Sequence, residues 1–531
     1  MKMILQNLLK ILMLVAGLDA YKILVLYPTP SFSHQRSILA LTERLIREGH
    51  ELFVISPNSV PELKNHPNYT FIDVSFSYKY FSDDTMDEDT FNMQKPISKW
   101  DFASQFPALS DFARKQLLSD AHLEFQGRFV IEEKIKFDLV IVETIFVSFA
   151  CVMTRTYAGA APIVTLHTYA MINSVENSIG SIPHLSYVPS SFNHYTNQMS
   201  LWQRMENWLV DNYIWSAYER AEDTSVRRYC KEMYGPGSDK LADDCGSDVS
   251  LALVANNPLY YYPRLLGPNV VEVGPLHLKT PEELPKKLRD WLDGAEKGAI
   301  YFSLGSNVKS KSLPAEVRSN FLRFFREHPK YRVLWKWELD GEIPGQSDNI
   351  LTQKWLPQDS VLAHPKLRVY IMQGGLQSFQ EAVHYGVPLV GIPFSGDQNC
   401  NVAKIVHAGI GVRIEPQDLQ VYEKLKAALE AVLLDERYSK NMKKLSAISR
   451  DFTSRGMDQA VFWVEHVAKH GGASHLRPAT ADTTLFQYFC LDIVSILLIF
   501  IFFVIYTVYR FGRFVLSSLT FKESQIKVKK C

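Results

Sequence analysis

The sequence predicts an α/β protein with two doubly wound, Rossmann-like domains, a cleft between them and one C-terminal transmembrane helix. Short runs rich in β-branched residues alternate with helical stretches, a pattern typical of parallel sheets covered by helices. A polar stretch after Gly274 and Pro275 divides this pattern into two series. The apolar run at residues 491–509 is close to the roughly 20 residues that span a bilayer core.

The composition agrees with a chain of two domains and gives no indication of a nucleic-acid partner. The chain has 531 residues, of which 47% are hydrophobic and 21% are charged, enough for more than one hydrophobic core. Lysine plus arginine and aspartate plus glutamate both total 57, so no charge imbalance indicates nucleic acid as a partner. We therefore expect recognition at local sites.

The N-terminal residues predict a secretory signal peptide at residues 1–20. Lys2 precedes an apolar core, and the small residues Gly17 and Ala20 follow it. A buried first helix is the alternative, but the segment runs directly into a strand-like run without a helix stop. The mature chain is expected to begin near Tyr21.

The first domain is predicted over residues 21–275. Its strands are expected at residues 22–27, 51–55, 69–74, 138–142, 163–166, 251–255 and 270–273. Two irregular parts interrupt the pattern: residues 76–106 mix aromatic and acidic side chains, and residues 201–229 predict a tryptophan-rich helical pair. Such insertions often carry a ligand-specific surface.

The second domain is predicted over residues 276–470. Its strands are expected at residues 299–304, 332–335, 367–372 and 389–392, with helical runs between residues 419 and 449. A juxtamembrane segment (471–490), the transmembrane helix (491–509) and a cytosolic tail (510–531) are expected to follow. Arg510 and Arg513 directly after the apolar run predict a type I topology with a lumenal body.

The last residues carry two open interpretations. Lys527 and Lys529 have the spacing of a dilysine signal for retrieval to the endoplasmic reticulum. A basic flank at an anionic membrane surface is the alternative, and Cys531 is a candidate for acylation. The favoured location is the endoplasmic reticulum membrane.

The lumenal topology bears on modification. Cys230 and Cys245 flank a polar loop and are a candidate disulfide, whereas Cys151 and Cys400 have apolar neighbours typical of buried free thiols. Asn68 begins the sequon Asn-Tyr-Thr and is therefore a predicted glycosylation site.

Residues 355–398 contain the residue types that a UDP-sugar requires. Trp355 follows a short strand and is stiffened by Pro357, so its indole is expected to stack on uracil, which is worth roughly 1 to 3 kcal/mol. Gln358 is a candidate to read the base edge. A core tryptophan at a strand end is the alternative for Trp355.

A glycine turn in this segment is suited to a diphosphate. The turn Gln373-Gly374-Gly375 follows a buried strand and precedes a helix that contains Ser378. Glycine permits close backbone approach, and the helix start offers N–H groups and the positive end of the dipole. Ser378 adds a hydroxyl within the first turn.

Further polar residues complete the expected donor site. Glu381 is a candidate to accept both ribose hydroxyls, and Asp397 with Gln398 is expected to face the sugar. Gly305 and Ser306 form a second glycine turn for phosphate. Solvated or dipole-complementing carboxylates and a common turn are the alternatives. The order and spacing of these residues favour the donor site.

The sequence Trp-x-x-Gln, Gly-Gly-x-x-Ser-x-x-Glu, Gly-Val-Pro and Asp-Gln resembles the signature of the UDP-glycosyltransferase family. The similarity covers nearly the whole chain, which looks like animal members, insect ones in particular, and like related baculoviral ecdysteroid transferases. It implies a GT-B fold, an N-terminal acceptor domain, a C-terminal donor domain and inverting transfer without a metal or cofactor. Insect-like members generally use UDP-glucose, so glucose is the expected sugar.

One residue departs from the family pattern. Most members have histidine before the paired glycines, and this chain has Gln373. An amide can donate a hydrogen bond to the diphosphate but cannot transfer a proton to it near neutral pH. Stabilisation of the leaving group is then expected to depend on the helix N-terminus and on Ser378.

Transfer to a hydroxyl needs a base, and His34 is the candidate. It follows the first strand, at the start of a helix, where a capping or packing histidine is the alternative. Resemblance to the Ser-His helix start of family members makes His34 the match to their general base. Glu143 occupies the place of their partner aspartate, and whether its carboxylate reaches His34 stays open.

Two competing interpretations remain. Asp87-Glu88-Asp89 resembles a metal-binding triplet, but it lies in a polar loop far from the donor segment, so no metal is expected. With Gln373 and Glu143 both altered, the chain is alternatively a membrane protein that binds UDP-sugar or lipophiles without efficient turnover. The expected partners are a UDP-sugar, a small lipophilic alcohol or phenol met in detoxification or hormone conjugation, the membrane and, left open, further copies of the chain.

Overall fold

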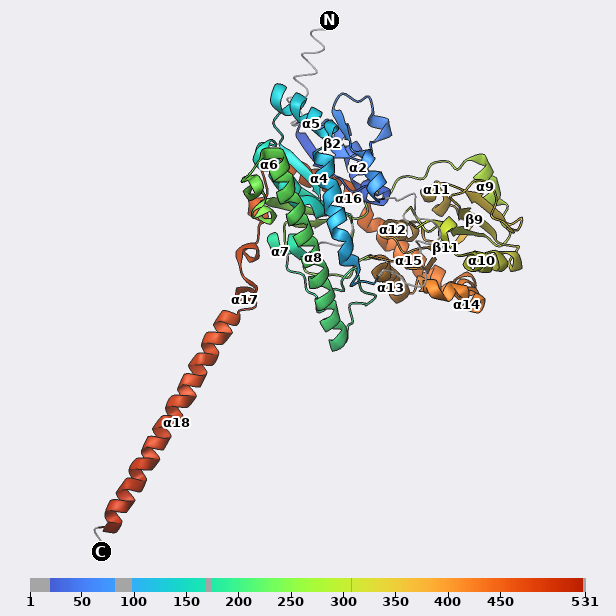
Figure 1. Cartoon of the computed structure of the whole chain (residues 1–531). Coiled ribbons are helices and arrows are strands. Elements are labelled where there is room, and N and C mark those ends of the chain that lie inside the picture. Colours follow the sequence, from blue (N-terminus) through green and yellow to red (C-terminus); the bar gives the residue numbers. More distant parts are fainter. Residues whose placement is uncertain (1–19, 82–97, 169–172, 307, 529–531) are drawn as a thin grey trace. The chain divides into compact units, whose positions relative to one another are not determined.

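The computed structural model describes residues 20–81, 98–168, 173–306 and 308–528 of the chain. The chain divides into two compact units, Met1–Arg477 and Pro478–Cys531, shown in Figure 1 and described here in turn. Three predicted features lie outside the described residues: nearly all of the signal peptide, the acidic triplet at residues 87–89, and the C-terminal cysteine with the lysine at position 529.

The first unit contains a seven-stranded parallel sheet with the order β3-β2-β1-β4-β5-β6-β7. The strands are β1 (Lys22–Leu26), β2 (Glu51–Ser56), β3 (Tyr69–Asp73), β4 (Leu139–Glu143), β5 (Ile163–His167), β6 (Val249–Val254) and β7 (Val270–Glu272). The order reverses at β1, as in a doubly wound sheet. Each predicted strand of this domain is found within a few residues of its expected position.

Both faces of this sheet are buried. In β1, Leu24 and Leu26 join one hydrophobic cluster while Ile23 and Val25 join another, which explains the continuous apolar run of the strand. The covering helices are α2 (Phe32–Arg47), α4 (Phe106–Leu117), α5 (Asp120–Phe125), α6 (Val147–Thr156), α7 (Asn173–Ser178), α8 (Leu201–Tyr234) and α16 (Gly456–His470). Helix α16 packs against α2, β4 and β6, so the last helix of the predicted second domain contributes to the first core.

A second parallel sheet of six strands has the order β10-β9-β8-β11-β12-β13. Its strands are β8 (Ala299–Phe302), β9 (Arg332–Lys336), β10 (Ile350–Gln353), β11 (Leu367–Met372), β12 (Leu389–Gly391) and β13 (Gly411–Arg413). Its helices are α9 (Lys286–Asp293), α10 (Ala315–Glu327), α11 (Gln358–Leu362), α12 (Leu376–Tyr385), α13 (Gln398–His407), α14 (Tyr422–Leu434) and α15 (Glu436–Thr453). The predicted fold class, two doubly wound α/β sheets, is confirmed, although the short edge strand β13 was not predicted.

The predicted tryptophan-rich helical pair is wrong, because these residues form the single long helix α8 (Figure 1). Ser200 begins it with a capping box, Gly235 follows its end, and no glycine or proline lies between them. Trp202 and Trp208 are exposed on its first turns, whereas Trp215 is buried against the sheet core.

The predicted cysteine pairing is also wrong. Cys151 on α6 forms a disulfide with Cys245, and their Cα atoms are 5.5 Å apart. Cys230 on α8 is instead a buried free thiol within the hydrophobic core, as is Cys400 on α13. The packing of α6 against the segment at Cys245 decides the pairing. Asn68, the predicted glycosylation site, directly precedes β3, and its Nδ2 donates to the Gly49 carbonyl at 3.3 Å.

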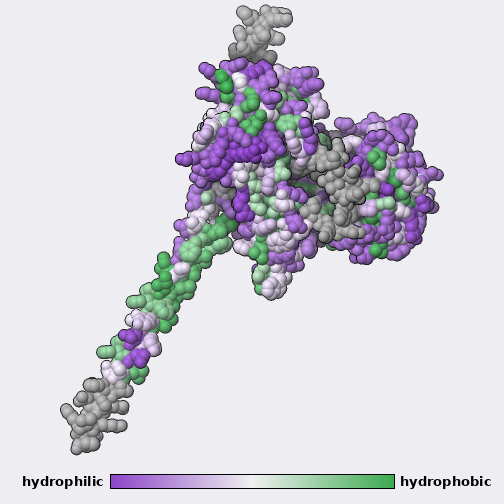
Figure 2. Space-filling view, viewed as in Figure 1, coloured by the Kyte–Doolittle hydropathy of each residue, from purple (hydrophilic) through white to green (hydrophobic). Residues whose placement is uncertain are grey.

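The second unit contains the short helix α17 (Leu485–Tyr488) and the long helix α18 (Leu491–Val528). The part of α18 from Leu491 to Leu519 spans 29 residues with a mean hydropathy of 2.7, long and apolar enough to cross a membrane. Figure 2 shows a hydrophobic surface along much of this helix. Helical structure continues past the predicted end at residue 509, and the apolar helix fits a membrane anchor.

Candidate active site

His34 and Glu143 meet at the carboxyl edge of the first sheet. Because β1 and β4 are neighbouring parallel strands, the loop after β1 and the last residue of β4 lie at the same edge. The Nδ1 atom of His34, in the first turn of α2, lies 2.8 Å from Oε1 of Glu143. The other Glu143 oxygen accepts the Thr29 N–H at 3.2 Å. The longer side chain of glutamate therefore reaches the imidazole.

This contact orients the histidine ring. Glu143 is almost completely buried, whereas the His34 side chain is 30% exposed. If Nδ1–H donates to the carboxylate, the lone pair of the ring is at Nε2, the atom that can accept a proton from another molecule. The arrangement is that of a histidine general base with an orienting carboxylate.

The predicted sugar residues lie on the C-terminal half. Asp397 precedes α13, and its Oδ2 accepts the Asn401 amide at 2.8 Å. Burial raises the pKa of Asp397, while the Asn401 hydrogen bond and the nearby His34 oppose that shift. His34 therefore lies near enough to act electrostatically on the Asp397 carboxylate. Gln398 also holds the loop before α13, because its Oε1 accepts the Phe394 N–H at 2.7 Å and the Ser395 N–H at 3.2 Å.

The glycine turn between β11 and α12 is closely packed. Gly374 has a φ of +94°, and a Cβ atom there would lie 2.6 Å from Cγ2 of Val402, so only glycine fits. Gly375 precedes α12, and no side chain caps its N-terminus. The N–H groups of this turn are the expected diphosphate donors. Gln373 lies beside the turn, with its Oε1 3.4 Å from Nε2 of Gln398.

The second glycine turn adjoins the first. Gly305 has a φ of +83°, and a Cβ atom there would lie 2.5 Å from Nε2 of Gln373. Because β8 and β11 are neighbouring parallel strands, the turns that follow them lie together. Ser306 follows Gly305 in this turn and is partly exposed. The structure thus brings Gly305 and Gln373 into one place, as two contacts to a single diphosphate require.

The Gln358 amide is engaged within the protein. The hydroxyls of Tyr301 and Tyr370 each donate to its Oε1 at 3.0 Å. Its Nε2 donates to Ser378 Oγ at 3.0 Å and to the Glu381 carboxylate. Gln358 therefore connects the expected ribose and phosphate residues, and these contacts occupy the atoms with which it was expected to read the base.

Trp355 is exposed at the edge of this site. It lies between β10 and α11, and 60% of its surface is exposed, which excludes the alternative of a core tryptophan. Its ring is 5.8 Å from that of Phe32 in an edge-to-face arrangement, and Lys336 Nζ lies 5.7 Å from its centroid. An exposed indole next to the glycine turns is suited to stacking on a base.

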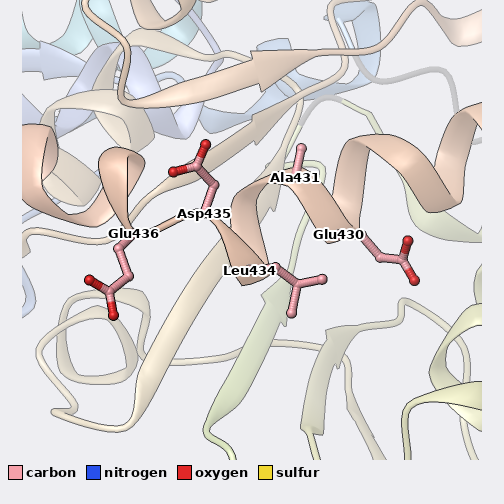
Figure 3. A pocket seen from close by; sticks show the side chains of 5 residues that line it. All are labelled: Glu430, Ala431, Leu434, Asp435 and Glu436. Carbon is pink, nitrogen blue, oxygen red and sulfur yellow. The ribbon is translucent and has the colours of Figure 1, made fainter.

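One further surface feature contains no predicted site residues. The depression in Figure 3 lies where α14 meets α15 and is lined by Glu430, Ala431, Leu434, Asp435 and Glu436, none of which is a predicted site residue. Within the described ranges, no group of three or more histidine, cysteine, aspartate or glutamate residues is arranged to hold a metal ion.

Comparison with known proteins shows the family to which this chain belongs. The sequence pattern of the family described as "UDP-glucoronosyl and UDP-glucosyl transferase" matches residues 22–526. The chain belongs to this family. UDP-glucosyltransferase 2 of Dactylopius coccus is 31% identical over 491 residues, which is 91% of each chain. Human UDP-glucuronosyltransferase 2B7 is 31% identical over 489 residues, which is 89% of each chain.

Solved structures agree in fold. The crystal structure of the glycotransferase of kitacinnamycin superposes with a TM-score of 0.55 at 18% identity, over 84% of this chain and 99% of the other. CalG4, the calicheamicin glycosyltransferase, has a TM-score of 0.53 at 15% identity, over 85% and 100%. The GT-B fold is thereby confirmed, and the protein is a UDP-glycosyltransferase. The baculoviral relationship stays a prediction.

Several residues that contact the candidate site had not been predicted. Arg36, His277 and Asp359 all lie around the Glu381 carboxylate, and Asn401 donates to the Gly374 carbonyl at 2.9 Å. Arg36 lies two residues after His34, but nothing local pairs it with a carboxylate more than 300 residues away. Only Asp359 directly follows a recognised motif, the Trp-x-x-Gln that ends at Gln358.

Replacing Trp355 with alanine tests the stacking surface of this UDP-glycosyltransferase. Loss of about 1 to 3 kcal/mol of stacking is expected to raise KM for the UDP-sugar roughly 5- to 150-fold with little change in kcat. The measurement is steady-state kinetics with varied donor. Phe462→Ala removes an exposed aromatic from α16 and is the matched control. An unchanged KM in Trp355→Ala would remove Trp355 from the donor site.

Proposed function

We propose that the protein transfers glucose from UDP-glucose to a hydroxyl of a small lipophilic acceptor, with inversion and without a metal ion. The observation that carries this proposal is the 2.8 Å contact between Nδ1 of His34 and Oε1 of Glu143 at the carboxyl edge of the first sheet. It supplies the base on which catalysis by this chain depends.

The proposed reaction is a single displacement. His34 Nε2 removes the proton of the acceptor hydroxyl as that oxygen attacks the anomeric carbon of the sugar. The bond between this carbon and the phosphate oxygen breaks, and its electron pair leaves with UDP, so the configuration inverts. The α12 N-terminus, Ser378 and the Gln373 amide would stabilise the charge that develops on the diphosphate.

Glucose is favoured over glucuronic acid by the resemblance to insect-like members of the family, which generally use UDP-glucose. Asp397 does not discriminate between the two sugars, because the Asp-Gln pair belongs to the signature of a family that transfers both. The Dactylopius coccus relative is named a glucosyltransferase and the human relative a glucuronosyltransferase, so both donors are reasonable candidates. The resemblance to insect-like members leads us to propose glucose.

The apolar helix α18 supports a proposal for the location and the acceptor class. Together with the predicted signal peptide and with Arg510 and Arg513, it supports a type I protein, which we place in the endoplasmic reticulum membrane with a lumenal body. Acceptors dissolved in or near a bilayer are lipophilic, and phenols and alcohols carry the hydroxyl that the reaction needs. A role in detoxification or hormone conjugation is the corresponding proposal.

A transfer assay in microsomes tests the function. Microsomes that contain the protein are incubated with UDP-glucose or UDP-glucuronic acid and a mixed panel of phenols and alcohols, with and without EDTA. Glucosides are expected from UDP-glucose, at a rate unchanged by EDTA. Transfer only from UDP-glucuronic acid would contradict the sugar assignment, and loss of transfer in EDTA would contradict the metal-independent mechanism.

A binding protein without turnover is the competing function, favoured by Gln373 in place of the usual histidine. Binding of UDP-glucose without any transfer over the whole acceptor panel would support it. The His34–Glu143 contact argues against it, because a non-catalytic site has no need for an oriented base.

A further inference from the structure

Arg36 connects the helix of the candidate base to the expected ribose site. It lies on α2, and its Nη1 donates to Oε1 of Glu381 while its Nη2 donates to Oδ2 of Asp359 at 3.1 Å. Both carboxylates belong to the donor segment, Asp359 on α11 and Glu381 on α12. The Arg36 side chain is 19% exposed and that of Glu381 is fully buried, so these charges interact with little screening by water.

Few groups other than Arg36 stabilise the ionised form of the Glu381 carboxylate. Its Oε2 accepts from Gln358, and His277 Nε2 lies 3.5 Å from its Oε1. Burial and Arg36 lower the pKa of His277 well below its ordinary value, so this imidazole is neutral. Burial raises the pKa of Glu381, Arg36 opposes the shift, and Asp359 adds to it. Burial likewise raises the pKa of Asp359, opposed by Arg36 and Lys279.

Helix α12 also contacts α2 on the N-terminal side of His34. The Gln377 amide donates to the carbonyl of Ser33, the residue before His34. Contacts from α12 therefore reach α2 one residue before His34 and two residues after it. A shift of α12 on donor binding would be transmitted to the imidazole through these contacts.

We propose that Arg36 is a positioning residue that keeps Glu381 ionised for the ribose hydroxyls and holds α2, with His34, against the donor helix α12. The proposal rests on the proposed function for the identity of the ligand. Because the Glu381 side chain is fully buried in this structure, ribose hydroxyls would reach it only after a local shift of the side chains around it. An ionised carboxylate has about four lone-pair sites, so Glu381 could then accept these hydroxyls while it keeps Arg36. Arg36 thus couples nucleotide binding to the place of the base.

The test is the affinity for UDP, measured by calorimetry on the full chain between pH 6 and 9. In Arg36→Met, two carboxylates face each other without their shared cation, so one of them takes up a proton. The affinity for UDP is expected to fall about tenfold or more at neutral pH and to recover as the pH rises and Glu381 ionises. The wild-type affinity is expected to change less over the same range.

A second substitution separates charge from shape. In Arg36→Met with Asp359→Asn, removal of the second carboxylate is expected to lower the pKa of Glu381 relative to the single variant and restore most of the UDP affinity. Arg44→Met, on the same helix but paired with Glu48 and Asp458, is the matched control. Tighter UDP binding by Arg36→Met would instead mean that Arg36 competes with the ribose, and no recovery in the double variant would also overturn the proposal.

The readouts distinguish this inference from the proposed function. Calorimetry with UDP requires no acceptor and no turnover, so absence of transfer by the wild-type protein contradicts only the proposed function. Transfer with a normal, pH-independent UDP affinity in Arg36→Met contradicts only the role of Arg36.

Discussion

Replacement of His34 with alanine is expected to lower kcat by about 10²- to 10⁴-fold while the affinity for UDP changes little. The reason is that a general base acts only as the acceptor hydroxyl loses its proton, whereas the nucleotide is expected to bind residues of the other sheet. The measurements are kcat with saturating UDP-glucose and the dissociation constant for UDP by calorimetry.

His34→Gln provides a closer control for shape. Its amide keeps a polar side chain in the first turn of α2 but cannot take a proton at neutral pH. The glutamine variant is therefore expected to be as slow as the alanine variant. A rate within a few-fold of wild type in both variants would show that another group, or water, removes the proton, and the proposed mechanism would fail.

The second large effect is expected from Glu143→Gln. The substitution keeps the shape and an oxygen that can accept from Thr29, but it removes the charge that supports a protonated imidazole next to it. We expect kcat to fall on the order of 10²-fold, with KM for the donor nearly unchanged. Steady-state kinetics with both substrates varied measures the two constants.

Glu143→Asp tests whether length or charge matters more. Family members resembled by this chain carry aspartate in this place, but here the longer carboxylate reaches both Thr29 and His34. A shorter side chain on the same backbone is expected to keep only part of this contact, so its rate should lie between those of wild type and Glu143→Gln. Equal rates in wild type and Glu143→Gln would exclude a catalytic contribution from the carboxylate.

Much of the fold could be predicted because its signals are local. Apolar runs such as residues 22–27 and 367–372 carry the strand pattern within a few residues. Gly386 directly follows α12, and Gly49 follows α2 after the single residue Glu48. The donor segment from Trp355 to Gln398 was recognisable for the same reason, since the expected nucleotide contacts lie on consecutive turns and helix starts. These features depend on neighbours in sequence.

Contacts between distant residues were less predictable. His34 and Glu143 are 109 residues apart, and their distance depends on the adjacency of β1 and β4 and on the length of the glutamate side chain. The cysteine pairing was predicted wrongly because closeness in sequence favoured Cys230 with Cys245, while packing brings Cys151 to Cys245 across 94 residues.

The sequence therefore determined the α/β class, the two sheets, the apolar C-terminal helix and the residue types of a UDP-sugar site. Only the tertiary structure decided that Glu143 reaches His34, that the Gln358 amide is held by Tyr301 and Tyr370, and that Arg36 lies on Glu381, 345 residues away. The physical reason is that hydrophobic period and turn chemistry act over a few residues. Hydrogen bonds and ion pairs between elements depend instead on strand order and helix packing, which no short stretch of sequence contains.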